Sequence, residues 1–362
     1  MHSPSCAGSP SKSPLATIRS EGSELRHLGK RHDRPDGIGT WLADLSMNVA
    51  ILGAGAMGSL FGGSLAESGQ AVTLIDVNDA HVRAIRERGL RLETDAGDRR
   101  ISALEACRPE DASTEPDLLI VFTKSLHTAS ALKGISRIIG PKTLVLTLQN
   151  GLGNVETIAE FVPTERVLLG TTTWPADVVG PGHVRSHGEG ATRLMAAVPD
   201  IDLSQASMVS EILSKAGLQC VVDRTVWKAI WEKVAFNAAL NSLCTITGCT
   251  VDQLGLTPEG MGLCSAVIDE VVSVAKAEGI DADADRCRQT VSLAIARHVG
   301  HKPSMLQDIV AGRPTEIAAI NGAVAGKARE RGIAVPHTEA LLGLVRLIEA
   351  RRKACCGVDE QA

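Results

Sequence analysis

Three polar residues recur at helical spacing in a segment that is otherwise largely apolar. Lys233, Asn237 and Asn241 lie four residues apart, so their side chains would share one face of an α-helix. Neighbours such as Trp231 and Phe236 predict that this helix is buried. A solvated polar face is the alternative, but the bulky neighbours leave little room for it. Buried polar groups need hydrogen-bond partners, and we therefore interpret the three residues as contacts to a bound substrate.

A second cluster of chemically informative residues is a glycine-rich loop. Residues 53–58 match the G-x-G-x-x-G pattern and lie between an apolar run at 48–52 and a helical pattern from Met57. Glycines at these positions allow a tight turn and a close approach of the backbone to a diphosphate, and the helix N-terminus supplies N–H groups. A glycine turn without a ligand is the alternative. The flanking elements favour a dinucleotide site formed by Gly53, Ala54, Gly55, Ala56, Met57 and Gly58.

An acidic residue follows the next apolar run at the position expected for ribose recognition. Asp76 ends the run 72–75 and lies 18 residues after Gly58. A carboxylate there accepts a hydrogen bond from the ribose 2′-hydroxyl of NAD and would repel the 2′-phosphate of NADP. Residues 77–80 contain no Arg or Lys to bind that phosphate. The sequence therefore favours NADH.

The elements around these residues alternate between short apolar runs and helical patterns over the first part of the chain. The predicted strands are residues 48–52, 72–75, 117–123, 143–148 and 167–173. Glycines and prolines then separate short extended pieces as far as Ala197, which predict antiparallel strands that close the sheet. From Ser204 the pattern is helical; the expected helices are residues 204–216, 224–247, 257–278, 283–299, 314–331 and 337–352. We expect an α/β fold, with an N-terminal Rossmann-type doubly wound sheet followed by an all-helical C-terminal domain.

These patterns predict two domains between two tails. Residues 47–220 would form the dinucleotide-binding domain and residues 221–352 the all-helical domain that binds and reacts with substrate. Residues 1–46 are rich in Ser, Gly, Pro, Arg and His and lack the apolar core of a signal peptide, so we expect a disordered N-terminal extension. Residues 353–362 would form a C-terminal tail.

The composition excludes several classes of protein. A net charge of −5 and an aromatic content of 2% give no basis for nucleic-acid binding. No apolar run reaches the roughly 18 residues that a membrane helix needs. The nine cysteines show no paired spacing typical of zinc ligands, and the histidines show none either, so we expect no metal. An odd number of cysteines without a secretion signal predicts reduced, mostly buried thiols in a cytoplasmic protein.

Several spaced motifs together resemble the ketopantoate reductase (2-dehydropantoate 2-reductase) family. The resemblance covers residues 47–352. Its motifs are the glycine loop, Thr123-Lys124, Gln149-Asn150-Gly151, the Lys233/Asn237/Asn241 helix and residues 303–308, 315–322 and 332–336. It implies NAD(P)H-dependent reduction of ketopantoate to pantoate, a step of pantothenate and coenzyme A biosynthesis.

The resemblance also implies a role for each matching residue. Lys233 would be the general acid that protonates the ketone oxygen, and Glu316 would contact the substrate hydroxyl. The residues implied to bind substrate are Asn150, Asn237, Asn241 and Ser304. The residues implied to contact the cofactor outside the glycine loop are Lys124 and Asn150. Alkoxide charge develops during ketone reduction, and a lysine whose pKa is lowered by burial is suited to neutralise it.

One departure from the family leaves alternatives open. The family norm is NADPH with a basic residue after the second strand, whereas Asp76 stands there. An NAD-dependent D-2-hydroxyacid dehydrogenase of the D-mandelate type, on the same scaffold, is therefore a second hypothesis. A non-catalytic NAD(H)-binding sensor is a third, although a sensor needs no proton donor such as Lys233. The expected partner is a small 2-keto acid, and the expected assembly is a monomer or a homodimer.

Overall fold

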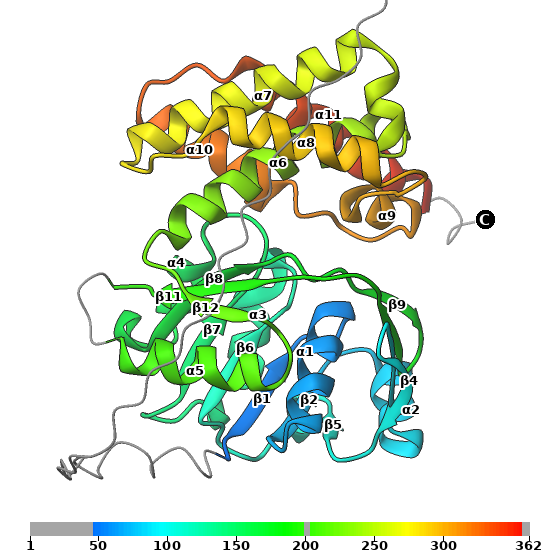
Figure 1. The fold of residues 1–362 in the computed structure, drawn as a ribbon, viewed down its shortest axis with the longest axis vertical. Helices are drawn as coiled ribbons and strands as arrows, with labels where there is room; N and C mark the ends of the chain where they lie inside the picture. The colour runs from blue at the N-terminus through cyan, green and yellow to red at the C-terminus, as the bar shows by residue number, and fades with distance from the viewer. Residues whose placement is uncertain (1–45, 199–202, 357–362) are drawn as a thin grey trace, which may run out of the picture. The chain divides into compact units, whose positions relative to one another are not determined.

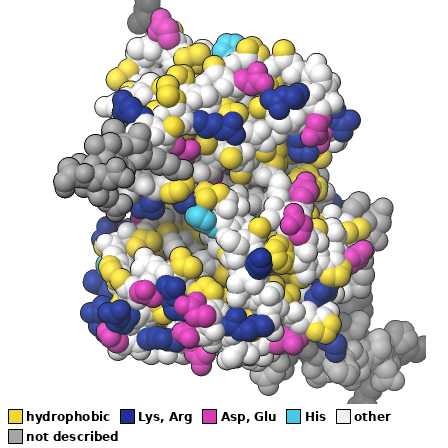
Figure 2. Space-filling model, turned by 180° about the vertical axis from the view of Figure 1, so that it is seen from behind, with side chains coloured by type: hydrophobic (Ala, Val, Ile, Leu, Met, Phe, Trp, Pro, Cys, Tyr) yellow, Lys and Arg dark blue, Asp and Glu magenta, His cyan; other side chains and the backbone are white. Residues whose placement is uncertain are grey.

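The computed structural model describes residues 46–198 and 203–356. The expected N-terminal extension, apart from Ser46, and the last six residues of the expected C-terminal tail lie outside the described residues. None of the helices in the described parts of the chain has the length and apolar character needed to cross a membrane. On the face seen in Figure 2, Lys and Arg side chains are interspersed with Asp and Glu rather than gathered in one basic stripe.

An eight-stranded sheet forms the first half of the described chain (Figure 1). Its spatial order is β12-β11-β8-β7-β6-β1-β2-β5, and the six strands from β8 to β5 run parallel. The strands are β1 (Asn48–Leu52), β2 (Ala71–Ile75), β5 (Glu105–Cys107), β6 (Leu118–Val121), β7 (Leu144–Thr147), β8 (Val167–Thr172), β11 (Thr192–Ala196) and β12 (Cys220–Val222). Strands β6 and β7 are buried at every residue, as the continuous apolar runs predicted for a sheet covered on both faces.

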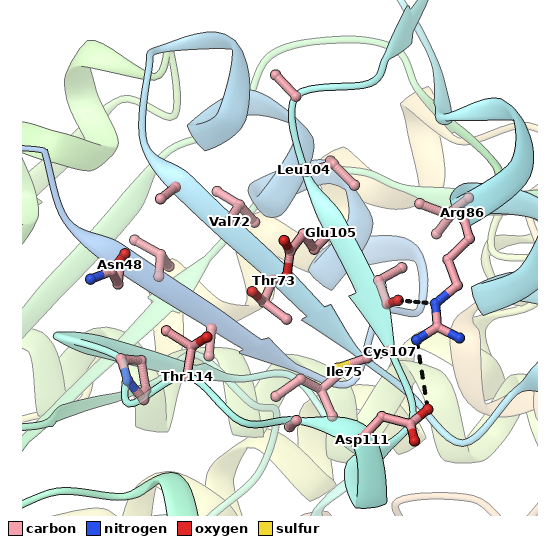
Figure 3. A pocket seen from close by; sticks show the side chains of 18 of the residues that line it. Asn48, Val72, Thr73, Ile75, Arg86, Leu104, Glu105, Cys107, Asp111 and Thr114 are labelled. Carbon is pink, nitrogen blue, oxygen red and sulfur yellow. Dashed lines mark hydrogen bonds and ion pairs between the residues drawn. The ribbon is translucent and has the colours of Figure 1, made fainter.

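Helices cover both faces of this sheet. One face packs against α1 (Ala56–Glu67), α2 (Asp79–Arg88) and α5 (Ser204–Lys215), and the other against α3 (Thr128–Gly134) and α4 (Asn154–Ala159). The second face is open over β1, β2 and β5, where residues of these strands line a groove of about 990 Å³. Figure 3 shows side chains that line it. Arg86 closes one side of this groove by donating to the Ala106 carbonyl at 2.7 Å and pairing with Asp111 at 3.6 Å. No residue of the glycine loop lines the groove.

A separate four-stranded sheet corrects the prediction for the extended pieces before Ala197. Its order is β4-β3-β10-β9, with β3 (Leu90–Thr94), β4 (Gly97–Ile101), β9 (Asp177–Gly180) and β10 (His183–Ser186). Of the extended pieces between β8 and Ala197, only β11 joins the main sheet, where it pairs antiparallel with β8 as expected. Strands β3, β4 and β5 were not predicted, because β4 has a single buried residue and β5 is only three residues long. The small sheet packs on α1, where Leu90, Leu92 and Ile101 surround Gly63.

The second half of the chain is helical and is built around α6 (Val226–Thr247). The other helical elements are the 3-10 helix η5 (Asp252–Leu256), α7 (Pro258–Ala277), α8 (Ala284–Arg297), α9 (Ser304–Val310), the π-helical turn η6 (Ala318–Gly322), α10 (Ala323–Glu330) and α11 (Pro336–Cys356). Helix α9 was not predicted, and α11 continues to Cys356, so the first four residues of the expected tail are helical. The expected fold class, a Rossmann-type doubly wound sheet followed by a helical domain, is confirmed (Figure 1).

The described cysteines agree with the expectation of reduced thiols. Cys107, Cys220, Cys244, Cys264 and Cys287 are buried and free, and Cys249 is free and half-buried. Burial raises the pKa of each of these buried thiols, to about 12 for Cys244 and Cys287, which keeps them protonated and unreactive.

Candidate active site

The glycine loop has the geometry of a cradle for a diphosphate. Gly53, directly after β1, has φ +96°, and a Cβ there would lie 2.7 Å from the Thr123 nitrogen. A Cβ at Gly58 would collide with the Gly53 carbonyl, so close packing of α1 on β1 requires glycine. A Cβ at Gly55 would meet nothing within 4 Å, so the loop backbone faces open space there. Together with the N-terminal N–H groups of α1, these features fit a dinucleotide.

Asp76 stands directly after β2, where a ribose would reach the loop. It is half-buried, and its Oδ1 accepts a hydrogen bond from the Asn78 N–H at 2.8 Å. The structure adds a residue that sequence reasoning missed: Arg108 follows β5, pairs with Asp79 at 2.9 Å and donates to the Val77 carbonyl. A basic group therefore does lie beside this loop, contrary to the expectation from residues 77–80. Predicting β5 as the strand beside β2 would have found it.

Arg108 is not a free cation beside the ribose site. Its guanidinium also pairs with Glu110 at 3.1 Å, so two carboxylates meet the one positive charge. A 2′-phosphate would have to displace these partners and would also face Asp76.

Lys233 projects from α6 toward the end of β8. Its Nζ donates to the Thr172 carbonyl at 2.8 Å, which leaves further N–H bonds of the ammonium for a ligand. The side chain is half-buried, and burial lowers the pKa of Lys233 to about 8, while the charge of Glu316 opposes the shift. A lysine with this pKa is mostly protonated at neutral pH and gives up a proton more readily than an ordinary lysine.

Glu316 joins the helical half of the chain to the loops at the ends of β6 and β7. Its Oε2 accepts a hydrogen bond from Asn150 Nδ2 at 3.2 Å, and its Oε1 accepts one from the Ser125 N–H at 3.4 Å. Burial raises the pKa of Glu316, while these hydrogen bonds and the Lys124 charge oppose the rise. Ser125 was not predicted as a site residue, although it adjoins the Thr123-Lys124 motif. The sequence could not show that its N–H lies against Glu316.

Asn237 and Asn241 are buried, with 7% and 5% of their surfaces exposed. Neither side-chain amide forms a hydrogen bond with another described residue. Their position on the same helix as Lys233, four and eight residues further on, makes them available to a ligand near that lysine. Ser304 is exposed at the first residue of α9 and makes no hydrogen bond to these residues.

Lys124 lies where the loop after β6 meets the helical half of the chain. Its Nζ pairs with Asp308 at 2.5 Å and donates to the Pro314 carbonyl at 2.9 Å. Asp308 is 6% exposed and also accepts from Arg313 at 3.1 Å. In this structure Lys124 therefore ties the loop after β6 to the helical half, and its contact with a cofactor remains a prediction.

The fold and this site define a nicotinamide-dependent oxidoreductase that acts on CH–OH groups. Residues 49–198 match the family described as "Ketopantoate reductase PanE/ApbA", and residues 225–349 match its C-terminal counterpart. The chain belongs to the ketopantoate reductase family.

Relatives of known name agree with this assignment. The 2-dehydropantoate 2-reductase of Streptococcus pyogenes is 36% identical over 305 residues, which cover 84% of this chain and 98% of that protein. The enzyme of the same name from Halobacterium salinarum is 36% identical over 84% of this chain and 99% of that protein. Among solved structures, a D-mandelate dehydrogenase with NADH and anilino(oxo)acetate has a TM-score of 0.81 at 33% identity. The superposition covers 85% of this chain and 100% of the D-mandelate dehydrogenase chain.

Proposed function

We propose that the chain is a 2-dehydropantoate 2-reductase that reduces ketopantoate to pantoate with NAD(P)H. The observation that carries the proposal is the placement of Lys233, whose pKa is lowered to about 8, on the same helix as two buried asparagines without side-chain partners. A 2-keto acid needs one donor for its ketone oxygen and others for its carboxylate. The exposed backbone of the glycine loop supports a dinucleotide beside it.

The nicotinamide ring supplies the hydride when the cofactor is bound. The Lys233 ammonium, held by the Thr172 carbonyl, stabilises the developing alkoxide and transfers a proton from Nζ to that oxygen. The amides of Asn237 and Asn241, with Ser304, hold the carboxylate and hydroxyl of the substrate. Glu316 accepts a hydrogen bond from the substrate hydroxyl and orients Asn150.

The same proposal includes a preference for NADH over NADPH. Asp76 offers an oxygen to the ribose 2′-hydroxyl, since only its Oδ1 accepts the Asn78 N–H. Arg108, the cation nearest in sequence to β5, is already paired with Asp79 and Glu110. We expect such an enzyme to work in the cytoplasm, where reduced nicotinamides and free thiols persist.

A D-2-hydroxyacid dehydrogenase of the D-mandelate type is the second candidate, and Asp76 is the observation that favours it. The polar groups described above would serve any 2-keto acid, so the choice depends on the side chain beyond the ketone. Steady-state rates with ketopantoate, benzoylformate and a branched 2-keto acid separate the two. The proposal predicts the highest kcat/KM for ketopantoate; a higher value for benzoylformate would replace it with the second candidate.

A further inference from the structure

A buried serine and a buried histidine connect the glycine loop to the small sheet. Ser59 is fully buried in α1, and its hydroxyl donates to the Ala54 carbonyl at 2.7 Å. His81, 4% exposed in the first turn of α2, places Nε2 3.1 Å from Ser59 Oγ. On the other side of the ring, Nδ1 accepts the N–H of Gly182, in the turn between β9 and β10, at 3.1 Å. Nothing in the proposed reaction uses Ser59 or His81.

The donor and the acceptor of each of these three hydrogen bonds can be assigned. A backbone N–H can only donate, so Nδ1 of His81 carries no proton. The neutral ring then has its proton on Nε2 and donates it to Ser59 Oγ. The hydroxyl proton of Ser59 is left for the Ala54 carbonyl. Burial lowers the pKa of His81, against the opposing charge of Asp76, so the ring is neutral at pH 7.

The last acceptor in this series of hydrogen bonds, the Ala54 carbonyl, lies in the glycine loop itself. The C=O and N–H of one trans peptide point in opposite directions. Because the Ala54 carbonyl points toward the buried Ser59 hydroxyl, the N–H of Gly55 points away from Ser59, and Gly55 itself is exposed. That N–H has no partner among the described residues.

We propose that Ser59 and His81 are positioning residues that fix the Ala54–Gly55 peptide so that the Gly55 N–H binds the cofactor's diphosphate. The small sheet takes part through the Gly182 N–H, which selects the tautomer of the ring. The inference rests on the proposed function only in assuming a nicotinamide dinucleotide.

The ribose contact is linked to the same histidine. Asn78 accepts the His81 N–H through Oδ1 at 3.1 Å and caps α2. Its own N–H donates to Asp76 at 2.8 Å. The first turn of α2 therefore helps to position both the Asp76 carboxylate, which we expect to face the ribose, and the His81 ring, which we propose orients the glycine loop.

The test compares Ser59→Ala and His81→Gln with Ser210→Ala in the full chain. Ser210 is a matched control, because its buried hydroxyl also donates to a backbone carbonyl, that of Cys220, at 3.0 Å, but on α5. NADH dissociation constants are measured by fluorescence titration without substrate, and thermal unfolding of the apoprotein shows whether each variant folds. We expect Ser59→Ala and His81→Gln to raise the NADH Kd about five- to tenfold, the effect of one lost hydrogen bond, and Ser210→Ala less than twofold. The NADH Kd of the double variant should be no higher than that of the single variant with the higher Kd, because both residues act through one peptide.

A second measurement needs no variant. Nitrogen-15 NMR of the wild-type apoprotein should show His81 with an unprotonated Nδ1 and a protonated Nε2. A wild-type Kd in Ser59→Ala, an equal loss in Ser210→Ala, or a His81 ring protonated at Nδ1 would each overturn the inference. Because the titration contains no keto acid, a protein that binds NADH but fails to reduce ketopantoate would refute the proposed function and leave this inference standing.

Discussion

The lowered pKa of Lys233 predicts how the reduction should depend on pH. In the proposed reaction the ketone oxygen receives its proton from the charged Lys233, and burial lowers the pKa of that lysine to about 8. At pH 7 about nine-tenths of the molecules then carry the proton, and at pH 9 about one-tenth do. We expect kcat/KM for ketopantoate reduction to fall about tenfold between pH 7 and pH 9, and pantoate oxidation, which needs the neutral amine, to rise over the same range.

The informative perturbation is Glu316→Gln. The Glu316 charge raises the pKa of Lys233 against the effect of burial, so its removal should move the alkaline limb of the reduction profile to lower pH. Glutamine keeps an oxygen that can accept from Asn150, as the carboxylate does at 3.2 Å. The assay is steady-state kcat/KM from pH 6 to pH 10 in a constant-ionic-strength buffer. The reasoning is refuted if the limb stays where it is in the wild type, or if the wild type shows no limb near pH 8.

Four further outcomes follow from the same residues. Lys233→Ala should lose at least about a hundredfold in kcat while binding NADH normally, and unchanged turnover would remove the lysine as the general acid. Lys233→Met should be more stable at pH 7, because a lysine with a lowered pKa costs stability while it is charged. We expect the free energy of unfolding to rise by at most about 3 kcal/mol and Tm to rise with it; a lower Tm would contradict this. Asp76→Ser should reduce the ratio of kcat/KM with NADH to kcat/KM with NADPH about tenfold in steady-state assays. An unchanged ratio would show that Asp76 does not contact the ribose. A chain that begins at Met47 should match the full chain in Tm and kcat, and a large loss in either would show that residues 1–46 belong to the fold.

Much of the fold could be predicted from the apolar runs. Strands β6 and β7 are buried on both faces, and their sequences contain no polar alternation to confuse them with surface strands. Strand β4, by contrast, has one buried residue among five, and its register depends on the neighbouring β3. Local pattern alone could not identify such a strand, because tertiary packing against α1 stabilises it.

The candidate site divides in the same way. The spacing of Lys233, Asn237 and Asn241 on α6 follows from helical geometry, and the structure places the lysine against Thr172. The sequence could not show that Glu316 lies against Asn150, 166 residues earlier, since such contacts depend on how the two halves of the chain pack. Arg108 was missed for the same reason, because it reaches Asp79 only through the pairing of β5 with β2.

The central claim is tested most directly by measuring kcat/KM for ketopantoate with NADH and with NADPH side by side. The account predicts efficient reduction to pantoate, with the higher value for NADH. Negligible turnover of ketopantoate with both cofactors, while benzoylformate or another 2-keto acid is reduced, would contradict it.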